Sequence, residues 1–71
     1  MEAVELNTQL MEVAYRIREM REISGFTQEE MAKKTDVSTA EYANYEAGNA
    51  DFPFTFIHKC ALAFGIGITD L

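Results

Sequence analysis

Apolar residues in the first third of the chain recur at alternating steps of four and three, the spacing of one face of an α-helix. The residues on this face are Leu6, Leu10, Val13, Ile17 and Met20. The pattern predicts a helix that is capped at its start by Asn7 or Thr8. It is expected to end near Ser24, where Gly25 can serve as the C-terminal cap. Residues 1–6 have no clear packing partner and are expected to form a loose extension.

Two capping boxes mark the starts of the next two helices. In a capping box the first side chain accepts a hydrogen bond from the amide three residues on, and the Glu at that position reaches back. Thr27 with Glu30 and Ser38 with Glu41 have this spacing. Each box is flanked by an apolar pair at the positions of a hydrophobic staple, namely Phe26 with Met31 and Val37 with Tyr42.

Both of these helices are short. The first is expected to end near Thr35, because Asp36 is among the few residues that tolerate a left-handed backbone. The second is expected to stop at Gly48. Residues 27–48 are therefore predicted to form two short helices joined by a tight turn.

A fourth helical segment is predicted to begin near Pro53 and to end at Gly65. Its apolar face carries Ile57, Cys60, Ala61 and Phe64, and is continuous with Phe52 and Phe54. Gly67 can cap a further helix, but the sequence ends at Leu71 before that helix completes a turn, so we expect the chain to be cut from a longer one. No segment alternates cleanly enough to suggest a half-buried strand. The predicted class is all-α.

Residues 13–71 resemble, almost throughout, the lambda-repressor-like (Cro/repressor) helix-turn-helix family of bacterial and phage transcriptional regulators. The residues that carry this resemblance are Arg16, Ile17, Met20, Arg21, Gly25, Phe26, Thr27, Gln28, Glu29, Glu30, Met31, Ala32, Val37, Ser38, Tyr42, Tyr45, Glu46, Gly48, Ala63, Phe64, Gly65 and Ile66. The resemblance implies a compact bundle of four or five helices over residues 7–71. In it, the unit 27–48 would bind double-stranded DNA and its second helix would enter the major groove.

Helical geometry independently assigns the two faces of that second helix. Tyr42 and Tyr45 lie three residues apart and are expected to point together into the core. The outer side then presents Thr39, Ala40, Ala43 and Asn44 as candidate base-reading residues. An Asn can make two hydrogen bonds to adenine, a Thr can bond either base type, and an Ala can contact the thymine methyl group.

The resemblance adds further site residues. In the family the start of the first short helix holds a DNA phosphate, a role that would fall here to Gln28 and the free amides behind Thr27. With Ser38, the full set of candidate DNA-binding residues is Thr27, Gln28, Ser38, Thr39, Ala40, Ala43 and Asn44. The family also pairs an arginine late in the first helix with a glutamate late in the third, which matches Arg21 and Glu46.

Charge argues against tight DNA binding. The chain has six Lys and Arg against twelve Asp and Glu, for a net charge of −6, and the unit 26–48 is its most acidic part. No Lys or Arg lies between Thr35 and His58, and only Arg16, Arg18, Lys33 and Lys34 are placed to meet phosphates. Because neutralised phosphates supply most non-specific affinity, we expect weak binding with a shallow salt dependence. An acidic protein-interaction or dimerisation module with little DNA affinity is the alternative hypothesis.

Metal binding, catalysis and cofactor binding find little support in the sequence. His58 and Cys60 are two residues apart on a helix and face different sides, so they cannot share a metal ion. No nucleophile, base and orienting group converge in 71 residues, and we expect neither an enzyme nor a bound cofactor. The remaining large apolar side chains are interpreted as core or interdomain packing, namely Met11, Met20, Met31, Phe52, Phe54 and Phe56.

The partners expected at this stage are an operator DNA and a second copy of the protein. One module of this kind buries too little surface to bind DNA tightly alone, so a homodimer on a roughly palindromic site is expected. Dimerisation is expected to come from missing C-terminal sequence. The Phe-Pro-Phe run at 52–54 is similar to regulators in which such a module precedes a cupin-like domain, and a small-molecule effector would act through that domain. No export signal or membrane span is visible, which favours a cytoplasmic protein.

Overall fold

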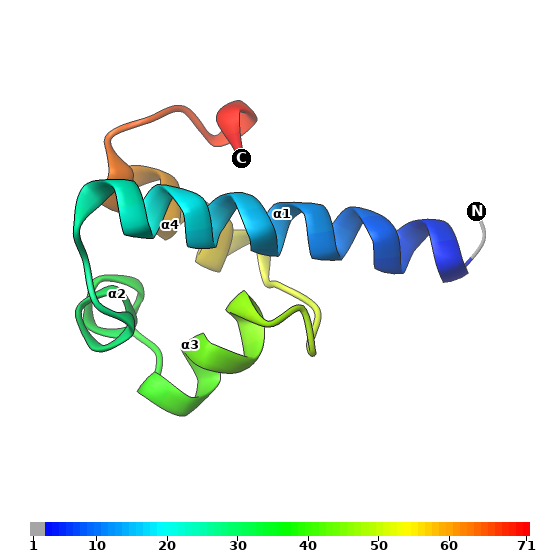
Figure 1. Cartoon of the computed structure of the whole chain (residues 1–71), viewed down its shortest axis with the longest axis horizontal. Helices are drawn as coiled ribbons and strands as arrows, with labels where there is room; N and C mark the ends of the chain where they lie inside the picture. Colours follow the sequence, from blue (N-terminus) through cyan, green and yellow to red (C-terminus); the bar gives the residue numbers. More distant parts are fainter. Residues whose placement is uncertain (1–2) are drawn as a thin grey trace.

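Helix α1, Ala3–Ser24, is the longest element of the molecule, and the other helices pack along its C-terminal half (Figure 1). The computed structural model describes the backbone of residues 3–71 and the side chains of residues 9–71. The remaining elements are α2 (Gln28–Thr35), α3 (Thr39–Glu46), α4 (Phe54–Phe64) and the short 3₁₀ helix η1 (Ile68–Asp70). No strand occurs in residues 3–71, in agreement with the predicted all-α class.

Helix α1 begins earlier than the sequence suggested. Its first residue is Ala3, whereas the capping argument placed the start at Asn7 or Thr8. Residues 3–6 are therefore helical and do not form a loose extension, while residues 1 and 2 of that expected extension lie outside the described part. The segment from Ala3 to Leu6 contains no Gly or Pro, so nothing in it stops the helix from continuing upstream. At the other end the prediction is confirmed, because α1 ends at Ser24 and Gly25 follows with φ of 79°.

The caps of α2 form as predicted. The Glu30 amide donates to Thr27 Oγ1 at 3.0 Å, and the Thr27 amide donates to Glu30 Oε1 at 2.8 Å, which completes the capping box. The helix ends after Thr35 at Asp36, whose φ of 61° is left-handed as expected. Since Asp36 is the one non-glycine residue with positive φ in the described chain, this turn depends on its short polar side chain.

Only half of the second predicted capping box is present. Ser38 Oγ accepts a hydrogen bond from the Glu41 amide at 3.0 Å, which satisfies one free amide at the start of α3. Within residues 9–71 no hydrogen bond returns from the Glu41 carboxylate to the Ser38 amide. Glu41 is exposed, so its carboxylate remains in water instead of being tied to the helix start.

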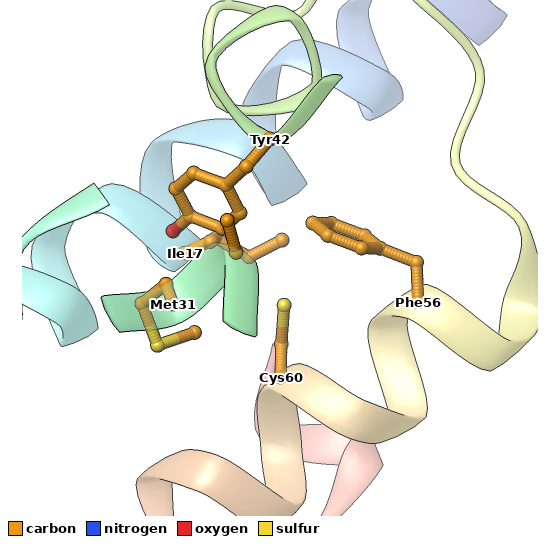
Figure 2. Packing of buried hydrophobic residues seen from close by; sticks show 6 residues of the cluster. Ile17, Met31, Tyr42, Phe56 and Cys60 are labelled. Atoms are coloured by element: carbon orange, nitrogen blue, oxygen red, sulfur yellow. The ribbon is translucent and has the colours of Figure 1, made fainter. Parts of the chain in front are cut away.

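One small apolar core joins all four helices. Figure 2 shows Tyr42 from α3 and Phe56 and Cys60 from α4 converging with Ile17 from α1 and Met31 from α2. Each of these five side chains is at most 3% exposed. Burial raises the pKa of the Cys60 thiol to about 12, so it stays protonated and acts as a small core residue.

Met11, which was interpreted as a core residue, is on the surface instead, and Phe54, which was interpreted as core or interdomain packing, lies outside the core of this domain. Met11 is 60% exposed and Phe54 is 72% exposed. Met11 lies more than a quarter turn from the buried Ile17, on the side of α1 that borders the turn at Gly48. Phe54 opens the first turn of α4, before that helix reaches the core at Phe56. Apolar residues at helical spacing therefore predicted buried faces on α1 and α4 that are wider than the real ones.

The C-terminal helix begins and ends where the sequence predicted. Helix α4 has Pro53 at its N-cap and ends at Gly65, whose φ of 72° is left-handed. The short η1 then begins after Gly67, whose amide donates to Asp70 Oδ2 at 3.2 Å. Between Ala3 and Leu71, no helix combines the length and the apolar character that a bilayer span requires.

Candidate nucleic-acid interface

Helix α3 turns one face to the core and leaves the other open to solvent. Tyr42 is completely buried and Glu46 is 8% exposed. On the outer side Thr39, Ala40 and Asn44 are exposed, and Ala43 is half-buried. The four candidate base-reading residues thus lie on one free surface, which is small in side-chain volume and carries no charge.

Aromatic contacts hold the inner face of α3 in place. The Tyr42 and Phe56 rings lie 5.9 Å apart, and the Tyr45 and Phe56 rings lie 4.5 Å apart. Tyr45 also meets Phe52 edge-on at 5.8 Å. Tyr42 is fully buried, while Tyr45 is half-buried at the edge of the same cluster. Because both tyrosines point inward, the helix cannot rotate about its axis without breaking this aromatic cluster.

A polar network fixes α3 to α1 and α2. Arg21 of α1 forms a two-pronged ion pair with Glu46 of α3, with Nε to Oε2 at 2.8 Å and Nη2 to Oε1 at 3.1 Å. Its remaining arm donates from Nη1 to the Phe26 carbonyl at 2.9 Å. Gln28 Nε2 donates to Glu46 Oε1 at 3.1 Å, which brings the start of α2 into the network. The pair expected from the resemblance is therefore formed, and it joins three helices.

The network sets the charge state of Glu46. Burial by itself would raise the pKa of this carboxyl group. The hydrogen bonds from Arg21 and Gln28 favour the carboxylate more strongly, and the pKa of Glu46 lies below its usual value of 4.5. The same contact with Glu46 raises the pKa of Arg21. Both groups are ionised at neutral pH, as a charge-assisted pair requires.

This shift predicts a pH dependence of stability. A carboxyl group with a lowered folded-state pKa stabilises the fold above its unfolded pKa and loses that contribution as the pH falls through the folded value. Unfolding free energy should therefore begin to fall below about pH 4.5, the ordinary pKa of Glu46. Urea unfolding measured from pH 6 to about pH 2 would show this, and Glu46→Gln should flatten the slope. An unchanged slope in Glu46→Gln would assign the acid sensitivity to other carboxylates.

Gln28 is placed differently from its expected role at a DNA phosphate. Its amide nitrogen is engaged with Glu46, and its side chain is only half-exposed. Thr27 is exposed, but its hydroxyl oxygen already accepts the Glu30 amide. What remains open at the start of α2 is backbone amide. A phosphate there would meet the helix terminus first and the Gln28 side chain second.

A shallow polar hollow of about 240 Å³ lies between α1, α2 and α3. Its lining residues are Arg18, Arg21, Gln28, Ala43, Glu46 and Ala47. Besides Arg21, this geometry brings Arg18 beside α3, although Arg18 also pairs with Glu22 at 3.4 Å. From the sequence, Arg18 was only one of four cations placed to meet phosphates, and Ala47 was not predicted as a site residue. The signal was present in the helical step from Ala43 to Ala47, which puts both residues on one side of α3.

Comparisons with known proteins agree with this geometry. No curated protein matches the sequence. Among solved structures, the crystal structure of the clp gene regulator ClgR from Corynebacterium glutamicum is similar, with 22% sequence identity and a TM-score of 0.81. The match covers 84% of this chain and 64% of that chain. A family model described as a helix-turn-helix domain matches residues 14–71, and the chain therefore belongs to the helix-turn-helix domain family.

Proposed function

We propose that this protein binds double-stranded DNA in a sequence-specific manner as part of a transcriptional regulator. The observation that carries the proposal is the free, uncharged outer face of α3, held from behind by Tyr42 and by the Arg21–Glu46 pair. In helix-turn-helix proteins the second helix of the unit lies in the major groove. The likeness to ClgR, a protein described as a gene regulator, supports the same role.

The side chains on α3 suit direct reading of bases. Asn44 is exposed and can form two hydrogen bonds to an adenine edge, while Thr39 can donate to or accept from either base type. Ala40 and Ala43 bring no bulk, so the helix backbone can approach the base edges closely, and a methyl group can contact thymine. Ser38, which caps α3, lies at the end that would meet the phosphates first.

Ion pairs also reduce the negative charge that would oppose binding to DNA phosphates. Of the five carboxylates in the unit 26–48, Glu46 is paired with Arg21 and Asp36 is paired with Lys59 at 3.2 Å. Glu30 is tied to the Thr27 amide. Glu29 and Glu41 are the two in this unit that face water without such a partner, and Lys33 and Lys34 offset them. Because Arg21 and Lys59 lie outside the unit, these two ion pairs reduce its formal charge of −3 to about −1 in effect.

Weak phosphate attraction makes two copies on one operator the natural arrangement. A single small module reads few base pairs, and pairing two modules on a palindromic site multiplies their contributions. We therefore propose that the DNA-bound form is a homodimer on a roughly symmetric site. A small-molecule effector, if the protein responds to one, would bind outside residues 7–71.

One observation favours a second candidate function. The net charge of −6 and the free Glu29 and Glu41 near the recognition face suit a basic protein partner better than a phosphate backbone. Under this alternative the fold is kept and its DNA affinity is lost. The same surface would then serve as an interaction site.

Selection from a random pool of double-stranded DNA at low salt tests the first proposal. We expect one enriched motif, and we expect Asn44→Ala to weaken binding to it by about 1–3 kcal/mol, with the loss confined to one base position. Gln9→Ala is the matched control, because Gln9 is an exposed amide on α1 away from α3. It should leave the affinity unchanged.

The two candidates give opposite outcomes in this assay. If no motif is enriched, or if Asn44→Ala and wild type bind the enriched motif equally, α3 does not read DNA. The acidic interaction function then becomes the better explanation. Increasing the salt concentration should reduce affinity only modestly, because few phosphates are neutralised.

A further inference from the structure

Helix α1 carries an exposed apolar patch outside the core, beside the C-terminal end of α3. Met11 and Tyr15 lie one turn apart and are each 60% exposed. They border a shallow surface hollow of about 490 Å³. Glu12, Arg16 and Glu19 complete its lining. We refer to these five residues as the α1 patch.

The α1 patch contains charges of both signs that the fold leaves unpaired. The ion pairs within residues 9–71 are Arg18–Glu22, Arg21–Glu46 and Lys59–Asp36. Glu12 and Arg16 belong to none of them, and both side chains are exposed. They lie along the same flank of the Met11–Tyr15 ridge, one helical turn apart. The third charge of the patch, Glu19, is also exposed and belongs to none of these pairs. A partner of this surface must therefore match an apolar ridge accompanied by two negative groups and one positive group.

We propose that a second copy of this chain covers the α1 patch, with the two α1 helices antiparallel across a two-fold axis beside residue 14. Residues 12 and 16 lie equally far from that axis, so Glu12 faces Arg16 of the second copy, and Arg16 faces the second copy's Glu12. The two charge pairs form together, as an isologous interface requires.

The same axis interleaves the apolar side chains. Along the seam the order becomes Met11, the second copy's Tyr15, Tyr15, and the second copy's Met11. Successive members are two residues apart, or about 3 Å in rise. Each Met11 therefore lies beside the Tyr15 of the other copy, and the two Tyr15 rings lie next to each other across the axis. A partner of single charge could pair with only one of Glu12 and Arg16, whereas a second copy of the patch pairs with both.

The shape of the molecule leaves room for this arrangement. The N-terminal turns of α1 extend past the other helices, which pack along its C-terminal half (Figure 1). An antiparallel copy centred near residue 14 places its own packed half beside those projecting turns. Two helices that meet over so few turns bury less than the roughly 1,200 Å² of a stable interface, so the dimer should be weak and concentration-dependent.

Sedimentation of the protein alone, across a concentration series and without DNA, tests the proposal. The weight-average mass should rise from 8.0 kDa toward twice that value. Glu12→Arg and Arg16→Glu each place like charges opposite one another, and each should weaken the dimer by about tenfold. The double variant Glu12→Arg with Arg16→Glu restores opposite charges and should recover the dimer.

Leu62→Glu is the matched control, because Leu62 is 65% exposed but lies on α4, outside the α1 patch. It should leave the mass distribution unchanged, and circular dichroism should show equal helix content in every variant. A wild type that stays at 8.0 kDa, or a double variant no better than the single ones, would overturn the proposal. The proposal does not depend on DNA binding, so its failure and that of the DNA hypothesis are separate results.

Discussion

Replacing Glu46 by alanine is expected to lower the unfolding free energy by about 3–5 kcal/mol, because it leaves the Arg21 guanidinium without its carboxylate in a nearly closed site. The Arg21 and Glu46 side chains are only 14% and 5% exposed. Gln28 would lose its hydrogen-bond acceptor at the same time. A domain of this size has a total stability of about 3–5 kcal/mol, so the variant should be largely unfolded at 25 °C.

The exposed pair between Arg18 and Glu22 offers a control on the same helix. Its side chains are 59% and 55% exposed, and exposed pairs of this kind contribute at most about 1 kcal/mol. Glu22→Ala should therefore shift a urea or thermal unfolding curve only slightly. If Glu46→Ala melts together with Glu22→Ala, then the network that orients α3 does not stabilise the fold.

Local signals in the sequence predicted most helix boundaries correctly. The Thr27–Glu30 box, the left-handed Asp36 and the glycines at 25 and 65 act over three or four residues, and their geometry does not depend on the rest of the chain. The buried position of Tyr42 followed equally well from helical periodicity. For this reason the all-α class and the solvent-exposed face of α3 could be predicted from the sequence.

Features that depend on tertiary contacts were harder to predict. Nothing near Gln28 in the sequence indicates that its amide reaches Glu46, eighteen residues on, because this contact exists only after α2 and α3 have packed. The exposure of Met11 had the same origin, since a methionine one turn from core positions fits either side of a helix. The start of α1 was missed because Asn7 is a common cap but is also tolerated inside a long helix.

Two substitutions of Tyr42 can distinguish how much stability comes from packing around α3 and how much comes from its polar contacts. The phenol ring is fully buried at the centre of the core, in contact with Phe56, so Tyr42→Ala should cost about 3–5 kcal/mol through lost contacts and the cavity that remains. Such a loss again approaches the whole stability of the domain. Denaturant unfolding followed by helical circular dichroism would measure it.

Tyr42→Phe should behave in the opposite way and is the matched control. The Tyr42 hydroxyl is buried and has no hydrogen-bond partner. Burial raises the pKa of this phenol, and the nearby Glu46 carboxylate raises it further. Removing an unsatisfied buried hydroxyl relieves a desolvation cost, so Tyr42→Phe should be at least as stable as wild type. A loss above about 1 kcal/mol would show that the hydroxyl donates to Glu46 in solution. The aromatic core and the Arg21–Glu46 network would then act as one coupled support for the recognition face, and not as two independent ones.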